Sequence, residues 1–122
     1  MTKRILFIED ESALQKAVGT VLLEEGFEVY AAVTGEEGLA LARREKPDLI
    51  LLDLILPEKD GFAVLDALKK DPETSRIPVI IMSNLEASED VQKALDRGAM
   101  TYLVKMNYKL EEVVEKITNI LK

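Results

Sequence analysis

Five short apolar runs, rich in β-branched residues, constrain the fold of this chain more than any other feature of its sequence. They occupy residues 5–8, 29–33, 49–52, 79–82 and 102–104. Several are apolar at every position, which is typical of strands covered on both faces. Between them, apolar residues recur with helical spacing, as in residues 14–22 and 110–121. This strict alternation predicts an α/β fold with a parallel sheet, right-handed crossovers and helices on both faces.

Residues typical of helix ends and turns lie where these apolar patterns begin and end. Gly26 and Gly98 stand where a left-handed residue commonly follows a helix. Residues 34–37 have the spacing of a capping box, and Pro47 and Pro78 each lie just before a strand. We therefore expect five strand–helix units, joined by short connections, within one domain spanning residues 1–122.

Composition excludes several classes of function. The 122 residues include 16 Lys plus Arg and 23 Asp plus Glu, a formal net charge of −7, which argues against nucleic-acid binding through this domain. The absence of Cys and His excludes disulfides, zinc–thiolate sites and Ser-His-Asp triads. The apolar runs are too short to span a bilayer and the first residues do not resemble a signal peptide, so we expect a cytoplasmic protein without a membrane partner.

Polar residues follow four of the expected strands, where ligands bind in folds of this class. They are Glu9 and Asp10, Asp53, Ser83, and Lys105. Taken singly, the acidic pair could cap the following helix, the serine could be a turn residue and the lysine a solvated charge. Asp53 differs because its neighbours are apolar, and an isolated buried charge there would cost several kcal/mol.

Together these side chains favour metal-dependent phosphoryl transfer. Three clustered carboxylates raise one another's pKa unless a cation lies between them, and Lys105 supplies only one positive charge. A hard divalent ion, Mg²⁺ or Mn²⁺, is the natural complement to oxygen ligands. Asp53 could then act as an anionic nucleophile, with the Ser83 hydroxyl and the Lys105 ammonium arranged around the incoming negative charge.

Three segments carry a resemblance to a known family. Residues 5–11 hold the first strand and its acidic pair, residues 53–61 fit D-x-x-[ML]-P-x-x-x-G, and residues 98–105 fit G-A-x-x-[YF]-[LI]-x-K. In combination they resemble the CheY-like receiver domain of two-component response regulators, over essentially the whole chain. The resemblance implies a three-layer (βα)5 fold, doubly wound and flavodoxin-like, with strand order 2-1-3-4-5.

The resemblance also implies a signalling role rather than that of an enzyme. Asp53 would accept a phosphoryl group from a phosphohistidine on a sensor histidine kinase or His-phosphotransfer protein. The implied ligands of Mg²⁺ are Asp10, Asp53, the backbone carbonyl of Ile55 and, through a water molecule, Glu9.

The resemblance also implies which residues stabilise the phosphoryl group and which change conformation on phosphorylation. Ser83 and Lys105 would hold the phosphoryl oxygens. On phosphorylation Ser83 would move toward the phosphate and Tyr102 would turn inward, remodelling the face of the fourth helix, fifth strand and fifth helix. The domain would be a monomer, or a phosphorylation-dependent dimer through that face. Tyr102 could equally be an ordinary aromatic residue that is half-buried on a strand and has no switching role.

The chain departs from the family pattern near the site. Met106 replaces the usual proline after Lys105, and a non-proline cis bond costs roughly 3 kcal/mol more than a trans bond. We therefore predict a trans Lys105–Met106 bond, or failing that a strained cis bond, and a shifted lysine. Glu9 replaces the commoner aspartate, and Asn84 is larger than the usual residue and would narrow access to the phosphate.

Two apolar positions bear on the lifetime of the phosphorylated state. Ile55 and Leu85 lie two residues after Asp53 and Ser83, where the family tunes attack of water on the acyl phosphate. We predict slow spontaneous loss of phosphate.

Other functions fit less well. A flavodoxin-like cofactor binder would need a hydroxyl-rich loop where residues 9–11 are acidic, and a haloacid-dehalogenase-type phosphohydrolase would carry its nucleophile after the first strand. No P-loop motif is present. The serious alternative is an atypical receiver that is never phosphorylated and acts as a protein docking module, for which Met106 and Asn84 are the only hints.

Overall fold

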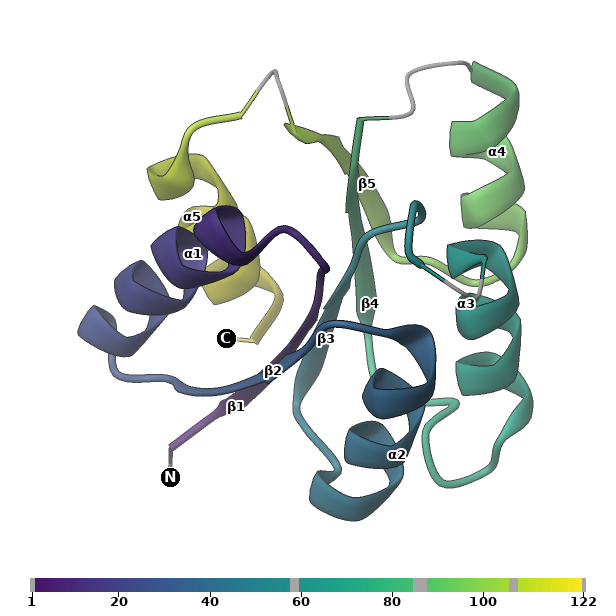
Figure 1. Ribbon diagram of the computed structural model, residues 1–122, viewed down its shortest axis with the longest axis horizontal. Coiled ribbons are helices and arrows are strands. Elements are labelled where there is room, and N and C mark those ends of the chain that lie inside the picture. Colours follow the sequence, from purple (N-terminus) through teal and green to yellow (C-terminus); the bar gives the residue numbers. More distant parts are fainter. Residues whose placement is uncertain (1, 58–59, 85–87, 106–107, 122) are drawn as a thin grey trace.

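The computed structural model describes residues 2–57, 60–84, 88–105 and 108–121, in which strands and helices alternate along the chain (Figure 1). In order they are β1 (Arg4–Ile8), α1 (Ser12–Glu24), β2 (Glu28–Ala32), α2 (Gly35–Glu45), β3 (Leu49–Leu52), α3 (Gly61–Lys70), β4 (Val79–Ser83), α4 (Ser88–Asp96), β5 (Thr101–Val104) and α5 (Leu110–Leu121).

The strands form one parallel sheet in the order β2-β1-β3-β4-β5. β1 pairs with both β2 and β3, so Ile5 stands opposite Val29 on one side and Leu49 on the other. After β1 the chain adds β2 on one side of it and then β3 on the other, so the strand order switches side at β1. Crevices at such a switch point commonly bind ligands. The predicted fold class and strand order are confirmed.

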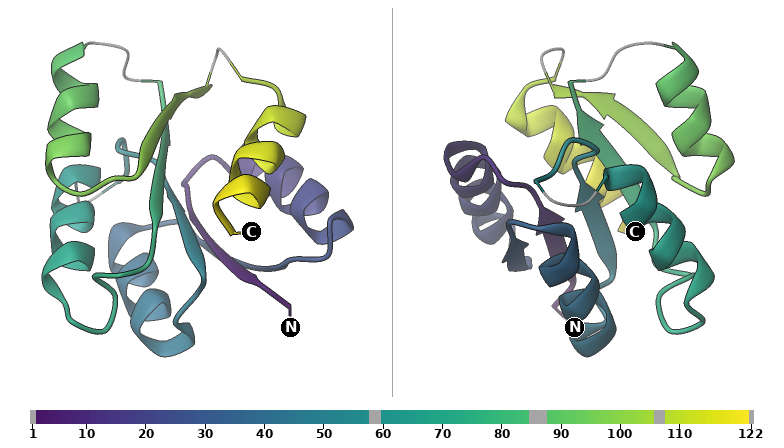
Figure 2. Two further views of the ribbon diagram at one scale, coloured as in Figure 1. Left: turned by 180° about the vertical axis from the view of Figure 1, so that it is seen from behind. Right: turned by 45° about the vertical axis from the view of Figure 1, so that its right-hand side comes forward.

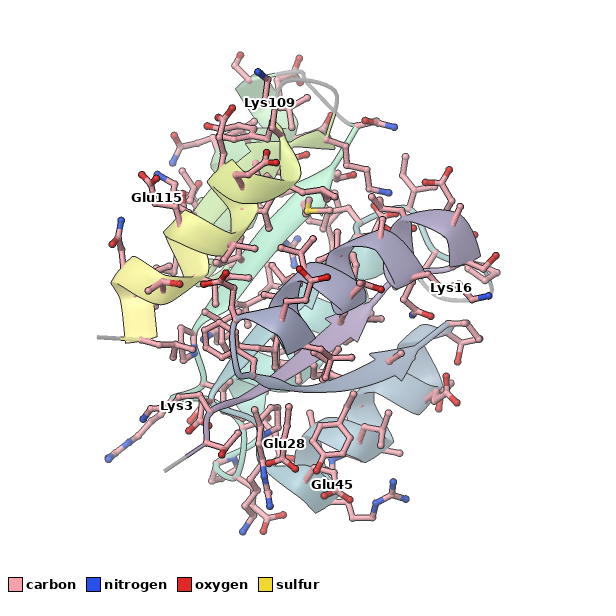
Figure 3. The ribbon with its side chains drawn as sticks, turned by 90° about the vertical axis from the view of Figure 1, so that its left-hand side faces the viewer. Lys3, Lys16, Glu28, Glu45, Lys109 and Glu115 are labelled. Carbon is pink, nitrogen blue, oxygen red and sulfur yellow. The ribbon has the colours of Figure 1, made fainter. Side chains whose placement is uncertain are left out.

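Each face of the sheet has its own core, because side chains alternate across a strand. Leu6 and Ile8 face the core shared with α2, α3 and α4, whereas Ile5 and Phe7 face the core shared with α1 and α5. All four side chains are fully buried. The two groups of helices cover opposite faces of the sheet (Figures 1 and 2), and α1 and α5 lie side by side, with Lys16 labelled on the first and Glu115 on the second (Figure 3).

Two predicted helix ends are confirmed. Gly26 and Gly98 have φ angles of +94° and +105°, the left-handed conformation that glycine adopts without strain. Thr34 caps α2, since its hydroxyl accepts a hydrogen bond from the Glu37 N–H at 3.1 Å. The Glu37 carboxylate, however, accepts from the N–H of Val33 at 2.8 Å rather than from the cap residue.

Some strand limits differ from those predicted by one residue. Hydropathy places Val33 inside the second strand, but the ladder ends where Ile8 stands opposite Ala32, and Val33 is 46% exposed. Ser83 pairs with Val104 and so belongs to β4. Backbone pairing sets these limits, and apolar character follows them only approximately.

No helix within the described ranges is long and apolar enough to cross a membrane.

Candidate functional site

The polar residues singled out from the sequence lie at the carboxyl edge of the sheet. Glu9 directly follows β1 and Asp53 directly follows β3, and these two strands are neighbours. The Asp53 N–H donates to the Ile8 carbonyl at 3.1 Å, and the Glu9 N–H donates to the Ala32 carbonyl at 2.9 Å. Strand pairing therefore holds both acidic residues side by side.

Asp53 is buried at this edge and both of its carboxylate oxygens have partners. Its residue is 3% exposed. Oδ1 accepts a hydrogen bond from the Ile55 N–H at 3.1 Å, and Oδ2 accepts one from Lys105 Nζ at 2.9 Å. The charge that the sequence places among apolar neighbours is thus stabilised by a lysine from the opposite half of the chain.

Lys105 also pairs with Glu9, which is fully buried. Its Nζ lies 2.7 Å from Glu9 Oε1 and forms an ion pair with it. Glu9 Oε2 accepts from the Glu11 N–H at 3.0 Å. Burial raises the pKa of the Glu9 carboxyl above its usual range, and the nearby lysine and N–H offset only part of that rise.

The pKa of Lys105 is also raised. Burial alone would lower it, but the carboxylates of Glu9 and Asp53 outweigh that effect and favour the charged ammonium. Lys105 therefore carries a positive charge near neutral pH and forms ion pairs with both carboxylates.

The acidic side chains could hold a metal ion. Glu9, Asp10 and Asp53 each offer a carboxylate oxygen, and the three oxygens lie within 4.8 Å of one another. With the single charge of Lys105 the group keeps a formal charge of −2, which one divalent cation would neutralise. Carboxylate oxygens are the ligands that hard divalent ions prefer, and the exposed Asp10 leaves the site open to solvent. The chemistry of the donor set fits the predicted metal.

These residues surround an open depression of about 390 Å³. Its lining consists of Glu9, Asp10, Glu11, Asp53, Ile55, Asn84 and Lys105. Ile55 is 55% exposed, so its apolar side chain stands at the rim over the predicted phosphoacceptor. Asn84 is exposed there too, as expected from its place after β4.

Ser83 is not part of that lining. It is fully buried, and its Oγ makes no hydrogen bond of standard geometry within the described part of the chain. Tyr102 is half-buried against the core that α2, α3 and α4 share with the sheet. Burial raises the pKa of the Tyr102 phenol, and the nearby Ser83 hydroxyl opposes that rise. The hydroxyl predicted to contact a phosphoryl group therefore lies beneath the surface, next to the predicted switch residue.

Two of the expected residues lie outside the described ranges. Leu85, predicted to affect phosphate lifetime, and Met106, predicted to follow a trans peptide bond, both stay as predictions.

Gly61 closes the loop that follows Asp53. Its N–H donates to the Leu54 carbonyl at 2.9 Å. A Cβ at this position would stand 2.3 Å from Leu54 Cα, so only glycine permits the close approach. The sequence motif of residues 53–61 includes this glycine, but the motif does not show that a side chain here would collide with the backbone of Leu54.

Gln15 is a site residue that no sequence motif indicated. Its side-chain Nε2 donates to the carbonyls of Glu9 and Ala32, both at 3.0 Å. A single glutamine in the second turn of a helix carries no sequence signal for such a contact, because the partners are backbone atoms of two strands.

Comparisons with known proteins agree with this geometry. A sequence model described as "Response regulator receiver domain" matches residues 5–118. The DNA-binding dual master transcriptional regulator RpaA of Synechocystis sp. is 40% identical over 119 residues, which are 98% of this chain and 49% of that protein. Protein PilH of Pseudomonas aeruginosa is 39% identical over 102 residues, 84% of each chain.

The solved structures agree as well. The CheY-like receiver domain protein from Methanospirillum hungatei superposes with a TM-score of 0.90 at 31% identity, covering 99% of this chain and 94% of that one. The chain spans about half the length of RpaA and 23% of response regulator PleD of Caulobacter vibrioides. With the family model matched over residues 5–118, this chain belongs to the response regulator receiver domain family, the signalling domain of two-component systems.

Proposed function

We propose that residues 1–122 act as one receiver unit that accepts a phosphoryl group on Asp53 from a phosphohistidine of a partner histidine kinase or His-phosphotransfer protein. One observation carries this proposal. Asp53 is buried, hydrogen-bonded to Lys105 at 2.9 Å, and shares with Glu9 and Asp10 a set of carboxylate oxygens within 4.8 Å. A nucleophile, a cation and metal ligands thus meet at one open depression.

In the proposed reaction a carboxylate oxygen of Asp53 attacks phosphorus. An O–P bond forms as the N–P bond of the donor breaks, and the electron pair of that bond leaves with the partner's imidazole, which takes a proton from solvent. Mg²⁺ held by Asp10, Asp53 and the Ile55 carbonyl, and by Glu9 through a water molecule, would supply positive charge that offsets the phosphoryl oxygens. The chain's own role is mainly positioning and charge stabilisation, as in other phosphoryl transfers.

Lys105 and Ser83 would then take new partners. Lys105 Nζ, which now bridges Glu9 and Asp53, would turn toward a phosphoryl oxygen. The buried hydroxyl of Ser83, which lies beside the Tyr102 phenol, would donate to another phosphoryl oxygen. Uncovering it requires movement at the end of β4.

That movement is the proposed signal. Tyr102 lies next to Ser83 on the neighbouring strand, so a shift of Ser83 would change the packing of Tyr102 and with it the face of α4, β5 and α5. We propose this face as the surface that partners, or a second copy of the domain, recognise. Apolar Ile55 and Leu85 would slow hydrolysis of the acyl phosphate.

Beryllofluoride, a stable mimic of the phosphoryl group, tests the proposal. With Mg²⁺ present it should bind the domain and shift the amide NMR signals of Ser83 and Tyr102, and the Asp53→Asn variant should show neither effect. Absence of any metal-dependent complex in the wild-type domain would instead identify a docking module that does not signal by phosphorylation.

A further inference from the structure

The amide of Gln15 joins the ends of two strands. Gln15 lies on α1, and its Nε2 donates one hydrogen bond to the Glu9 carbonyl and one to the Ala32 carbonyl, both at 3.0 Å. Nε2 of glutamine carries two hydrogens, so one nitrogen serves both acceptors. The Ala32 carbonyl also accepts the Glu9 N–H at 2.9 Å, which makes a compact three-way contact just beyond the sheet.

The position of Gln15 in the helix is fixed close to the same turn. Its backbone N–H donates to the carbonyl of the N-cap residue Glu11 at 3.0 Å, the first regular bond of α1. The side chain of Gln15 therefore starts from a backbone that is already tied to the residue after Asp10, and it reaches back to the residue before it.

Within the described ranges, few other side-chain contacts fix this turn. α1 has no side-chain cap at Glu11, and its first turn contains no acidic residue. The Glu11 N–H donates to Glu9 Oε2 at 3.0 Å, a contact that uses one of the carboxylate oxygens itself. Asp10 is exposed, so packing does not fix its direction. The side-chain amide of Gln15 is thus a side-chain anchor of this turn that uses no carboxylate, and it adds to the backbone bond between the Glu9 N–H and the Ala32 carbonyl.

We propose that Gln15 is a positioning residue for the metal site, which it serves by holding the backbone of Glu9 and so setting the directions of the Glu9 and Asp10 carboxylates. The inference rests on the proposed function in one respect only, that these carboxylates bind a divalent cation. Outer residues that orient metal ligands typically contribute about 10- to 100-fold to metal affinity. A neutral donor suits the position, because an acidic side chain would repel both carbonyls.

The test compares Gln15→Met with Gln92→Met. Methionine has nearly the length of glutamine but donates no hydrogen bond. Gln92 lies on α4 and its Nε2 donates to Asp96 Oδ1 at 2.7 Å, away from the depression, so its replacement removes a comparable amide contact. Mg²⁺ affinity is measured by calorimetry well below the melting temperature, and phosphorylation by acetyl phosphate is measured at limiting and at saturating Mg²⁺.

We expect Gln15→Met to raise the Kd for Mg²⁺ by about tenfold or more, whereas Gln92→Met leaves it unchanged. At saturating Mg²⁺ the phosphorylation rate of Gln15→Met should return to that of the wild type, because Gln15 acts only through the ligands. If Gln15→Met fails to fold, Gln15→Asn, whose shorter side chain cannot reach both carbonyls, replaces it with the same expectation.

The outcomes separate the two proposals. An unchanged Kd in Gln15→Met, or an equal rise in both variants, overturns the positioning role while the proposed function stands. A wild-type domain that binds no Mg²⁺ overturns both. A lower melting temperature of Gln15→Met with unchanged affinity shows a purely structural residue and also overturns the inference.

Discussion

Lys105 Nζ lies 2.9 Å from Asp53 Oδ2 and at the same time 2.7 Å from Glu9 Oε1, so one ammonium group bridges the acidic residues that follow β1 and β3. Both carboxylates are buried and the lysine side chain is 14% exposed. The ion triad of Glu9, Asp53 and Lys105 therefore joins the ends of β1, β3 and β5 at the proposed site.

Replacement of Lys105 by Met should destabilise the metal-free domain by about 3 kcal/mol, because two buried carboxylates lose their cation. Urea unfolding in EDTA measures the effect. Added Mg²⁺ should recover part of the loss in the variant. An unfolding free energy equal to that of the wild type would show that the triad contributes nothing to the fold.

Replacement of Ser83 by Ala should affect signalling more than stability. The hydroxyl is fully buried beside the Tyr102 phenol, so its removal should change the free energy of unfolding of the resting domain by no more than about 1 kcal/mol. The same variant should bind beryllofluoride more weakly, because it lacks a donor to the phosphoryl oxygens. Denaturant unfolding and a beryllofluoride titration check the two effects, and unchanged binding of beryllofluoride would contradict the role proposed for Ser83.

Gly61→Ala should destabilise the domain by about 2 to 4 kcal/mol, since the new Cβ would stand 2.3 Å from Leu54 Cα. Gly19→Ala is the matched control. Its Cβ would meet its nearest atom at 4.0 Å within α1, and alanine should stabilise that helix by roughly 0.5 to 1 kcal/mol. Thermal unfolding compares the two variants, and equal effects would show that the closure of the loop after Asp53 does not require glycine.

Phe62 of α3 contacts a cation of α4 and one directly after it. Lys93 Nζ lies 4.1 Å from the centre of the Phe62 ring, and the Arg97 guanidinium lies 6.0 Å from it. These contacts add to the packing of α4 on β5 and to the burial of its Ala94. Phe62→Leu should reduce the protection of α4 amides from hydrogen exchange by about 1 kcal/mol while leaving α1 unaffected. Uniform loss across both helices would indicate a general effect on the core instead.

Asp71 makes stability depend on pH. The Glu73 N–H and the Arg43 guanidinium both donate to its carboxylate, and they hold the pKa of Asp71 below its ordinary value of 3.8. Its contribution is present above pH 3.8 and is lost as pH falls through the lower, folded-state pKa. Asp71→Asn should therefore be less stable than the wild type at neutral pH, and the difference should vanish in strong acid. Urea unfolding across this range, with Asp96→Asn as control, measures it, and a difference independent of pH would contradict the assignment.

Much of this architecture could be predicted from the sequence because burial on both faces of a parallel sheet leaves a strong pattern. Runs such as Leu49–Leu52 are apolar throughout, and the polar residue after each run marks the edge where ligands bind. The convergence of Glu9, Asp53 and Lys105 follows from that rule alone.

What the sequence could not give depends on contacts between backbone and side chain. The bridging of two carbonyls by Gln15, the burial of Ser83 beneath the depression, and the ion pair of Lys105 with Glu9 all arise from three-dimensional packing. None of them leaves a spacing or a composition that could be recognised in one chain.

Phosphorylation at Asp53 is the central claim, and intact-mass spectrometry tests it most directly. The wild-type domain, incubated with a phosphoramidate donor and Mg²⁺, should gain the mass of one phosphoryl group, and it should gain none in EDTA or as Asp53→Asn. An unmodified wild-type domain, or equal modification of the Asp53→Asn variant, would contradict the account.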